Sequence, residues 1–367
     1  MRYFLIAGEA SGNLHAVRLI GQLKIKDSEA QFYYYYHPEL AYMGYVSVIM
    51  HLSKILHGIK ACKQEIINWK PDCLILVDYP GFNLKIAEFV RKNIDIPVFY
   101  YISPKIWAWK ERRINAIRRD ITAILSILPF EKDWFAKHNY HDVKYVGNPS
   151  TEEIDEFLHG NRTDSTTFRK QYGLDKRPII AILPGSRKQE IELNLKHMLK
   201  AASHYSMDYQ IVLAAAPTID ASLLQEIAAG YPITIIKDAT YQILRHSTAA
   251  LVTSGTATLE TALLGVPQVV CYRTHFPKIA SFLMHLVLKV KHVSLVNLIV
   301  QRSLVAELLT SKATPKNIRQ ELERILHGGD KRADILDGYR QMRKILGKHN
   351  TAEHAARHII SLMQSNR

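Results

Sequence analysis

Short apolar runs recur along this chain, and each ends in small, polar or proline residues. In the first half the runs occupy residues 3–7, 73–77, 97–102 and 123–128. A continuous apolar run of this length is typical of a parallel strand that is covered on both faces. Because the ligand-binding loops of such sheets follow the carboxyl ends of the strands, the residues directly after each run are candidate site residues.

A second series of apolar runs begins after a polar stretch at about residues 155–177. Its runs occupy residues 179–183, 210–214, 233–236, 249–252 and 268–272. A chain of 367 residues is long enough for two domains. The sequence therefore predicts an α/β fold with two Rossmann-like, doubly wound domains that face a central cleft. We expect residues 1–160 to form the first domain and residues 161–367 the second.

The formal net charge of the chain is +14 at pH 7, which suits an anionic partner. The sequence holds no zinc-finger spacing and no aromatic pattern of an RNA-binding domain, so phosphate-bearing substrates or an anionic membrane are favoured over nucleic acid. Three cysteines without a Cys-x-x-Cys pair favour reduced thiols and the cytoplasm. We find no signal peptide and no apolar run long enough to span a membrane.

Two strand-to-helix junctions of the second half have the composition of anion sites. The first is Gly185, Ser186 and Arg187, and the second consists of Ser254, Gly255, Thr256, Ala257 and Thr258. Such junctions expose backbone N–H groups at the positive end of a helix dipole. Glu260 falls on the helix that follows, where a carboxylate can hold ribose hydroxyls. Each loop alone is as well explained by an ordinary turn, but together they predict a site for a ribose diphosphate.

Six segments of the chain carry a more specific resemblance. They are Gly8-Glu9-Ala10-Ser11-Gly12, Val77-Asp78-Tyr79-Pro80-Gly81-Phe82-Asn83, Ser103-Pro104-Lys105-Ile106-Trp107-Ala108-Trp109, Leu128-Pro129-Phe130-Glu131, Leu183-Pro184-Gly185-Ser186-Arg187 and residues 254–260. In this order they resemble the lipid-A-disaccharide synthase family, and the version seen here is similar to its Bacteroidetes branch. The resemblance spans most of the chain.

The resemblance implies an inverting glycosyltransferase of the GT-B type from a Gram-negative bacterium. Its members join UDP-2,3-diacylglucosamine to 2,3-diacylglucosamine 1-phosphate (lipid X) through a β-1,6 bond and release UDP. Carried over to this chain, it makes Asp78 the catalytic carboxylate. A general base at the end of a buried strand fits that role, although an acid at this place could also be a plain turn or cap residue.

The resemblance also implies the rest of the site. It makes the N-terminal domain the acceptor-binding domain and the C-terminal one the UDP-sugar-binding domain. Glu9, Ser11 and Asn297 match family positions at the acceptor side or the cleft, and Glu9 and Ser11 could equally be turn formers. Arg187 and the 254–258 loop would stabilise the departing diphosphate. No Asp-x-Asp pair occurs in a suitable loop, so we expect no metal and no cofactor other than the donor substrate itself.

An apolar segment in the first half is the candidate membrane contact. Val46, Val48, Ile49, Leu52, Ile55 and Leu56 fall mostly at helical spacing. A helix packed on the core is the common explanation of such a pattern. Because both substrates carry acyl chains and the family has an exposed apolar patch here, we expect peripheral contact with the inner face of the inner membrane. Homodimerisation is left open.

The chain departs from the family pattern after Tyr36. Family members insert a glycine-rich loop and a helix there, so we expect the N-terminal sheet to be altered at one edge, with acceptor binding or activity affected. Asn13 also stands where the family has Asp. Three alternative functions stay open: a MurG-like transferase, a UDP-GlcNAc 2-epimerase, or a degenerate lipid- or nucleotide-binding homologue without activity.

Overall fold

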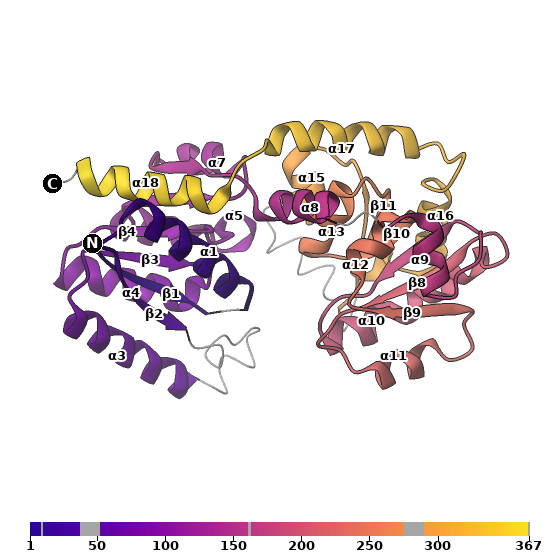
Figure 1. Cartoon of the computed structure of the whole chain (residues 1–367), viewed down its shortest axis with the longest axis horizontal. Helices are drawn as coiled ribbons and strands as arrows, with labels where there is room; N and C mark the ends of the chain where they lie inside the picture. Colours follow the sequence, from indigo (N-terminus) through magenta and orange to yellow (C-terminus); the bar gives the residue numbers. More distant parts are fainter. Residues whose placement is uncertain (9, 37–51, 161–162, 275–289, 366–367) are drawn as a thin grey trace. The chain divides into compact units, whose positions relative to one another are not determined.

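The computed structural model describes residues 1–8, 10–36, 52–160, 163–274 and 290–365. The chain divides into two compact units. The first unit combines Met1–Pro149 with Lys348–Arg367, and the second is Ser150–Gly347. The first unit thus ends at residue 149, against the expected 160. It also takes in residues 348–367, because the last helix packs on its core (Figure 1).

The first unit contains a parallel six-stranded sheet in the order β2-β1-β3-β4-β5-β6. The strands are β1 Arg2–Ala7, β2 Gln31–Tyr36, β3 Cys73–Val77, β4 Val98–Tyr101, β5 Ala123–Ser126 and β6 Val143–Tyr145. The helices are α1 Ala10–Lys26, α3 Leu52–Trp69, α4 Pro80–Asn93, α5 Ile106–Trp109, α6 Ile114–Asp120, α7 Glu131–Lys137 and α18 Thr351–Ser365, with a 3₁₀ turn, η2, at Glu111–Arg113.

Both faces of this sheet are covered, as the apolar runs predict. Side chains alternate along each strand, so Phe4 and Ile6 lie on one face while Tyr3 and Leu5 lie on the other. The first face packs against α3, α4, α6 and α7. The second face packs against α1 and α18, which lie side by side in Figure 1. Because helices cover both faces of the sheet, side chains that alternate between the faces are buried at every position. The strands are therefore apolar throughout.

The second unit contains a parallel six-stranded sheet in the order β12-β11-β10-β7-β8-β9. The strands are β7 Ile179–Leu183, β8 Gln210–Ala215, β9 Ile233–Lys237, β10 Ser247–Thr253, β11 Gln268–Tyr272 and β12 Ala306–Leu309. The helices are α8 Pro149–Gly160, α9 Ser165–Gln171, α10 Lys188–Ala202, α11 Ala221–Ala228, α12 Thr240–Arg245, α13 Thr256–Leu263, α15 Leu295–Val300, α16 Pro315–Glu323 and α17 Arg332–Leu346, with 3₁₀ turns η3 Ser203–Tyr205 and η4 Thr310–Lys312.

The strand orders locate the ligand-binding edge of each sheet. In the second unit, chain order runs outward from β7 in one direction and from β10 in the other, which is the order of a Rossmann fold. Its topological switch point lies between β7 and β10. In the first unit the order reverses between β1 and β3. Ligands bind beyond the carboxyl ends of the strands at such points.

In the part of the chain that the structure describes, one edge of the first sheet has fewer strands than the matching edge of the second. Beyond β7 lie two strands, β8 and β9, whereas beyond β1 the described residues contain β2 alone. The chain then crosses to β3 through α3. This difference lies at the edge at which the sequence departs from the family pattern, after Tyr36. Whether it affects acceptor binding stays a prediction.

Candidate active site

The loop after β3 presents Asp78 in a constrained backbone geometry. Asp78 and the next residue, Tyr79, have φ angles of 47° and 46°, in the left-handed region that L side chains rarely adopt. Two side chains hold the Asp78 carbonyl oxygen: the Tyr100 hydroxyl donates to it at 2.6 Å and the Asn83 amide at 2.7 Å. The turn is therefore fixed from a neighbouring strand and from the following helix.

The loop after β1 lies against this turn. A Cβ atom at Gly8 would come within 2.5 Å of the Tyr79 ring, so only glycine fits at that position. The two loops that flank the switch point of the first sheet are therefore in contact. Glu9 lies outside the described residues, and Ser11 lies in α1 with a side chain that is likewise outside the description.

The Asp78 carboxylate is half-buried, and its charge state reflects opposing effects. Burial raises the pKa of Asp78, while the positive charge of Lys105 and the backbone N–H of Tyr79 lower it. Asp78 lines a cavity of about 230 Å³. The other residues that line this cavity are Pro80, Pro104, Lys105, Ile106, Trp109, Lys110 and Arg113. A partly desolvated carboxylate at the wall of a cavity is suited to accept a proton.

A second buried carboxylate, Glu131, fixes the loop after β4. Glu131 accepts hydrogen bonds from the Ser103 hydroxyl at 2.6 Å, from the Trp107 indole N–H at 2.9 Å and from the Ser126 hydroxyl. Burial raises the pKa of Glu131, and these three donors lower it. Lys105 lies between Ser103 and Trp107 in the sequence, and its charge acts on Asp78.

In the second unit, the two predicted UDP loops follow neighbouring strands. β7 and β10 pair in parallel, with Val252 opposite Leu183, so both loops emerge at the same sheet edge. The 185–187 loop follows β7 and the 254–258 loop follows β10. The structure therefore brings the two loops together, at the switch point of the second sheet.

The loop after β7 requires glycine at its first turn. Gly185 has a φ of 109°, and a Cβ atom there would lie 2.7 Å from a carboxylate oxygen of Glu190. Arg187 forms an ion pair with Glu190 at 3.2 Å, and its side chain is 60% exposed. Glu190 and Arg187 also act electrostatically on Tyr272, at the end of β11. The Arg187 guanidinium is thus solvent-accessible at the ligand-binding edge.

The loop after β10 begins α13. Gly255 has a φ of 150°, and Gly255 and Thr256 are exposed at the start of the helix, where backbone N–H groups have no intrahelical partner. Thr258 is fully buried, and its hydroxyl donates to the Gly255 carbonyl at 2.8 Å. Ala257 packs against the core of the unit. The exposed backbone at residues 255–256 is therefore the part of this loop best placed for a phosphate.

Glu260, one turn further along α13, has a perturbed charge state. Burial raises its pKa to about 7, the nearby Glu153 carboxylate adds to the rise, and a hydrogen bond with Tyr241 opposes it. A carboxyl group with such a pKa changes its charge near neutral pH. Perturbed carboxyls of this kind concentrate at functional sites.

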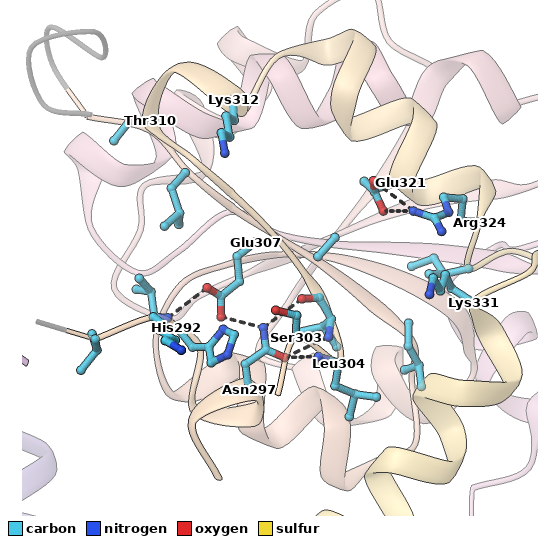
Figure 2. A pocket seen from close by; sticks show the side chains of 18 residues that line it. His292, Asn297, Ser303, Leu304, Glu307, Thr310, Lys312, Glu321, Arg324 and Lys331 are labelled. Atoms are coloured by element: carbon cyan, nitrogen blue, oxygen red, sulfur yellow. Dashed lines mark hydrogen bonds and ion pairs between the residues drawn. The ribbon is translucent and has the colours of Figure 1, made fainter. Parts of the chain in front are cut away.

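Asn297 serves an internal network. Its amide donates to the Val305 carbonyl and to Glu307, both at 2.9 Å, and its oxygen accepts from the backbone N–H groups of Leu304 and Val305. Figure 2 shows this network in a cavity of about 650 Å³ beside β12. None of residues 185–187 and 254–260 lines that cavity. A role of Asn297 toward substrate stays a prediction.

The apolar segment is described only at its end. Val46, Val48 and Ile49 lie outside the described residues, and Leu52 begins α3 with a side chain outside the description. Ile55 is half-buried and packs against the core, whereas Leu56 is 49% exposed. Among the helices that the structure describes, none has the length and apolar character to cross a membrane. In the same residues, no group of three or more His, Cys, Asp or Glu side chains could hold a metal ion.

The whole chain is similar to proteins of one family. A family model described as lipid-A-disaccharide synthetase matches residues 3–361. The lipid-A-disaccharide synthase of Myxococcus xanthus is 35% identical over 386 aligned positions, which cover 100% of this chain and 98% of that protein. The synthase of Syntrophus aciditrophicus is 34% identical, with 99% and 98% covered. The chain belongs to the lipid-A-disaccharide synthase family.

Solved structures agree on the fold of this synthase-family chain. The S. aureus MnaA-UDP co-structure matches with a TM-score of 0.68 and 12% identity, covering 99% of this chain and 97% of that one. A UDP-GlcNAc 2-epimerase from Neisseria meningitidis bound to UDP-GlcNAc matches with a TM-score of 0.62 and 14% identity over 100% of both chains. The calicheamicin glycosyltransferase CalG4 gives 0.59 and 14%, with 99% and 98% covered. The predicted GT-B fold class is confirmed.

Family membership also bears on the shortened segment. The alignment with the Myxococcus synthase extends over 386 positions, more than the 367 residues of this chain, so it contains gaps on this side. The aligned length does not place these gaps along the chain, so the shortened passage after Tyr36 stays a prediction.

Several residues of the candidate site were not singled out from the sequence. Asn83 and Glu131 lie inside the quoted family segments, but nothing in those segments tells a buried hydrogen-bonding residue from a substrate ligand. Tyr100 and Tyr241 lie on other elements and meet Asp78 and Glu260 only through the fold. Both tyrosines lie within apolar strand or helix patterns, and those patterns do not distinguish them from ordinary core residues.

Proposed function

We propose that this chain transfers 2,3-diacylglucosamine from its UDP donor to the 6-hydroxyl of 2,3-diacylglucosamine 1-phosphate, forming a β-1,6-linked disaccharide and UDP. The observation that carries this proposal is the family match over residues 3–361. The positions of the candidate residues support it, because the loops of each sheet that carry them flank its switch point.

Asp78 is the general base of the proposed reaction. Its carboxylate takes the proton of the acceptor 6-hydroxyl as that oxygen attacks the anomeric carbon of the donor. The bond from the anomeric carbon to the phosphate oxygen breaks, and its electron pair leaves with UDP. Asn83 and Tyr100 hold the turn that presents the carboxylate, and Lys105 favours its ionised form.

The second unit binds the donor. Arg187 and the backbone of residues 254–256 hold the diphosphate, and their charge and N–H groups stabilise the negative charge that develops on the leaving UDP. Glu260 accepts hydrogen bonds from the ribose hydroxyls. The reaction needs no metal on this assignment. The chain works at the inner face of the inner membrane, in contact with the acyl chains of both substrates.

The test is a turnover assay with mass-spectrometric detection of the tetra-acyl disaccharide phosphate. Wild-type protein forms this product, and Asp78→Asn lowers kcat by about 10²- to 10⁴-fold, because proton transfer contributes that much. The donor KM stays within about twofold, since the carboxylate acts on the acceptor. Asp95→Asn, an equal change at an exposed acid of the same unit, is the control.

Other outcomes would contradict the proposal. Full activity of Asp78→Asn would show that another group takes the proton. Turnover of UDP-GlcNAc without the acylated disaccharide would assign a different UDP-sugar reaction. UDP binding without any turnover would identify a homologue that has lost its activity.

A further inference from the structure

The cavity that contains Asp78 is lined by more positive than negative charge. Lys105, Lys110 and Arg113 line it, and among the lining residues that the structure describes Asp78 is the one acid. All three cations come from the segment that leads from the loop after β4 through α5 to η2. Three cations beside one carboxylate give the cavity a positive electrostatic potential. Such a potential suits a doubly charged anion.

Two of these cations are held close together. Lys110 is half-buried, and its pKa is lowered by burial and by the charge of Arg113. The Lys110 ammonium lies 4.1 Å from the centre of the Trp109 ring. The charge of Arg113 also acts on Tyr100, the residue that holds the Asp78 carbonyl. Lys110 and Arg113 therefore lie within electrostatic reach of each other at the wall of the cavity.

The backbone that carries the cations is fixed rather than extended into solvent. The Lys110 N–H donates to the Ile106 carbonyl at 3.2 Å, and the Arg113 N–H donates to the Lys110 carbonyl at 2.9 Å. Trp107, between Lys105 and Lys110, is anchored by Glu131. Such preorganisation lowers the entropic cost of binding a ligand.

The size and walls of the cavity limit what it can hold. Its volume of about 230 Å³ is below the roughly 300–1,000 Å³ of pockets that take a whole small molecule. Ile106 and the 44% exposed Trp109 provide apolar walls beside the cations. The cavity therefore suits one charged group of a larger amphiphilic ligand.

We propose that Lys110 and Arg113 bind the phosphate of the acceptor sugar, and that Lys105 lies between this phosphate and Asp78. The inference rests on the proposed function and adds to it the residues that select a phosphorylated acceptor. The acceptor is favoured over the donor because the same cavity contains the base that takes the acceptor proton. The donor diphosphate is assigned to loops of the second unit.

The test compares the acceptor with and without its phosphate, in detergent micelles, at saturating donor. In wild-type protein, kcat/KM is higher for 2,3-diacylglucosamine 1-phosphate than for 2,3-diacylglucosamine. Arg113→Ala lowers kcat/KM for the phosphorylated acceptor by about 10- to 100-fold, which corresponds to the loss of a charge-assisted hydrogen bond. It leaves the value for the other acceptor within about twofold. Arg113→Lys restores part of the loss.

Arg112→Ala is the matched control. Arg112 precedes Arg113 in the same turn, is exposed and does not line the cavity. Its removal changes net charge equally and leaves acceptor discrimination unchanged. In a second arm, soluble glucosamine 1-phosphate inhibits wild-type protein competitively with acceptor, more strongly than inorganic phosphate or glucosamine. Arg113→Ala raises its inhibition constant at least about 10-fold.

A lipid headgroup is the other source of a phosphate, and vesicles of phosphatidylglycerol distinguish it. If Arg113→Ala and Arg112→Ala weaken vesicle binding equally and neither changes acceptor discrimination, the cavity is part of a general basic surface and the inference is wrong. Equal losses for both acceptors would also overturn it. Failure of wild-type protein to form any disaccharide would instead refute the proposed function.

Discussion

At Asp78, a strained backbone conformation coincides with a partly buried charge. Asp78 and Tyr79 occupy the left-handed region in succession, which costs on the order of 1–3 kcal/mol for each residue. The hydrogen bonds from Tyr100 and Asn83 to the Asp78 carbonyl offset that cost. The turn that carries the carboxylate is thus held in one backbone conformation.

Glu260 gives the donor site a dependence on pH. Its pKa of about 7 means that the carboxylate becomes protonated as the pH falls below neutrality. The ionised form accepts much more strongly from the two ribose hydroxyls than the protonated acid does, so we expect the donor KM to rise by up to about tenfold per unit below pH 6. Glu260→Gln raises the donor KM at pH 8 and removes this dependence, as steady-state kinetics from pH 5.5 to 8.5 can measure.

The raised pKa of Glu260 also predicts how the free energy of unfolding depends on pH. This dependence tests the raised pKa without any measurement of catalysis. Because the folded-state pKa lies above the ordinary value of 4.5, ionisation of Glu260 opposes folding, and this cost grows from about pH 4.5 to pH 7. Glu260→Gln lacks the cost. Urea denaturation should therefore show the variant gaining stability relative to wild type as pH rises through that window, and a constant difference would contradict the raised pKa.

At the scale of elements, the sequence located the strands of both sheets that carry the candidate site. The runs at 73–77, 179–183 and 268–272 coincide with β3, β7 and β11. These strands are buried at nearly every position, so their apolar pattern is continuous. β6 and β12 were not predicted. They are edge strands of three and four residues with partly exposed side chains, and such short stretches carry no periodicity.

Site residues that lie in a loop motif could be predicted from the sequence. Residues that contact them from another strand or helix could not. The loops at 185–187 and 254–258 were recognisable by their small residues, and the sheet order brings them together as expected. The contact of Tyr100 with Asp78 depends on the pairing of β3 with β4. That pairing is a long-range property, which local patterns do not determine.

The three donors that converge on Glu131 join two strand ends to α7. Glu131→Ala leaves Ser103, Ser126 and Trp107 without their shared acceptor in a buried site. We expect the free energy of unfolding of the first unit to fall by about 3 kcal/mol, as measured by urea denaturation. Glu88→Ala, which removes an exposed pair with Lys92, should change it by less than about 0.5 kcal/mol. Similar values for both variants would show that the network adds no stability.

For the whole molecule, net charge and exposed apolar residues predict membrane attachment. The chain carries a net charge of +14, and Leu56 is exposed on α3 near the undescribed apolar segment. We expect sedimentation with anionic vesicles that weakens at 0.5 M salt, where charges are screened. Leu56→Asp should weaken binding about tenfold, because burial of leucine is lost.

Ile67→Asp is the control for that measurement. Ile67 is 46% exposed on the same helix, about three turns further from the apolar segment. Its replacement should leave vesicle binding unchanged. If the two variants behave alike, Leu56 has no special position at a bilayer and the apolar segment is ordinary core.

The return of α18 to the first unit affects the order in which the molecule can be built during translation. Residues 150–347 leave the ribosome as one uninterrupted stretch, so the second unit has all its parts before residues 351–365 exist. The first sheet is made earlier but must wait for the side chains of α18, including Ala355 and Ile359, to cover its face. At synthesis rates of about 5–20 residues per second, the part of that face that α18 covers stays open for roughly ten seconds or longer. We expect this surface of the nascent chain to be open to chaperone binding until α18 emerges.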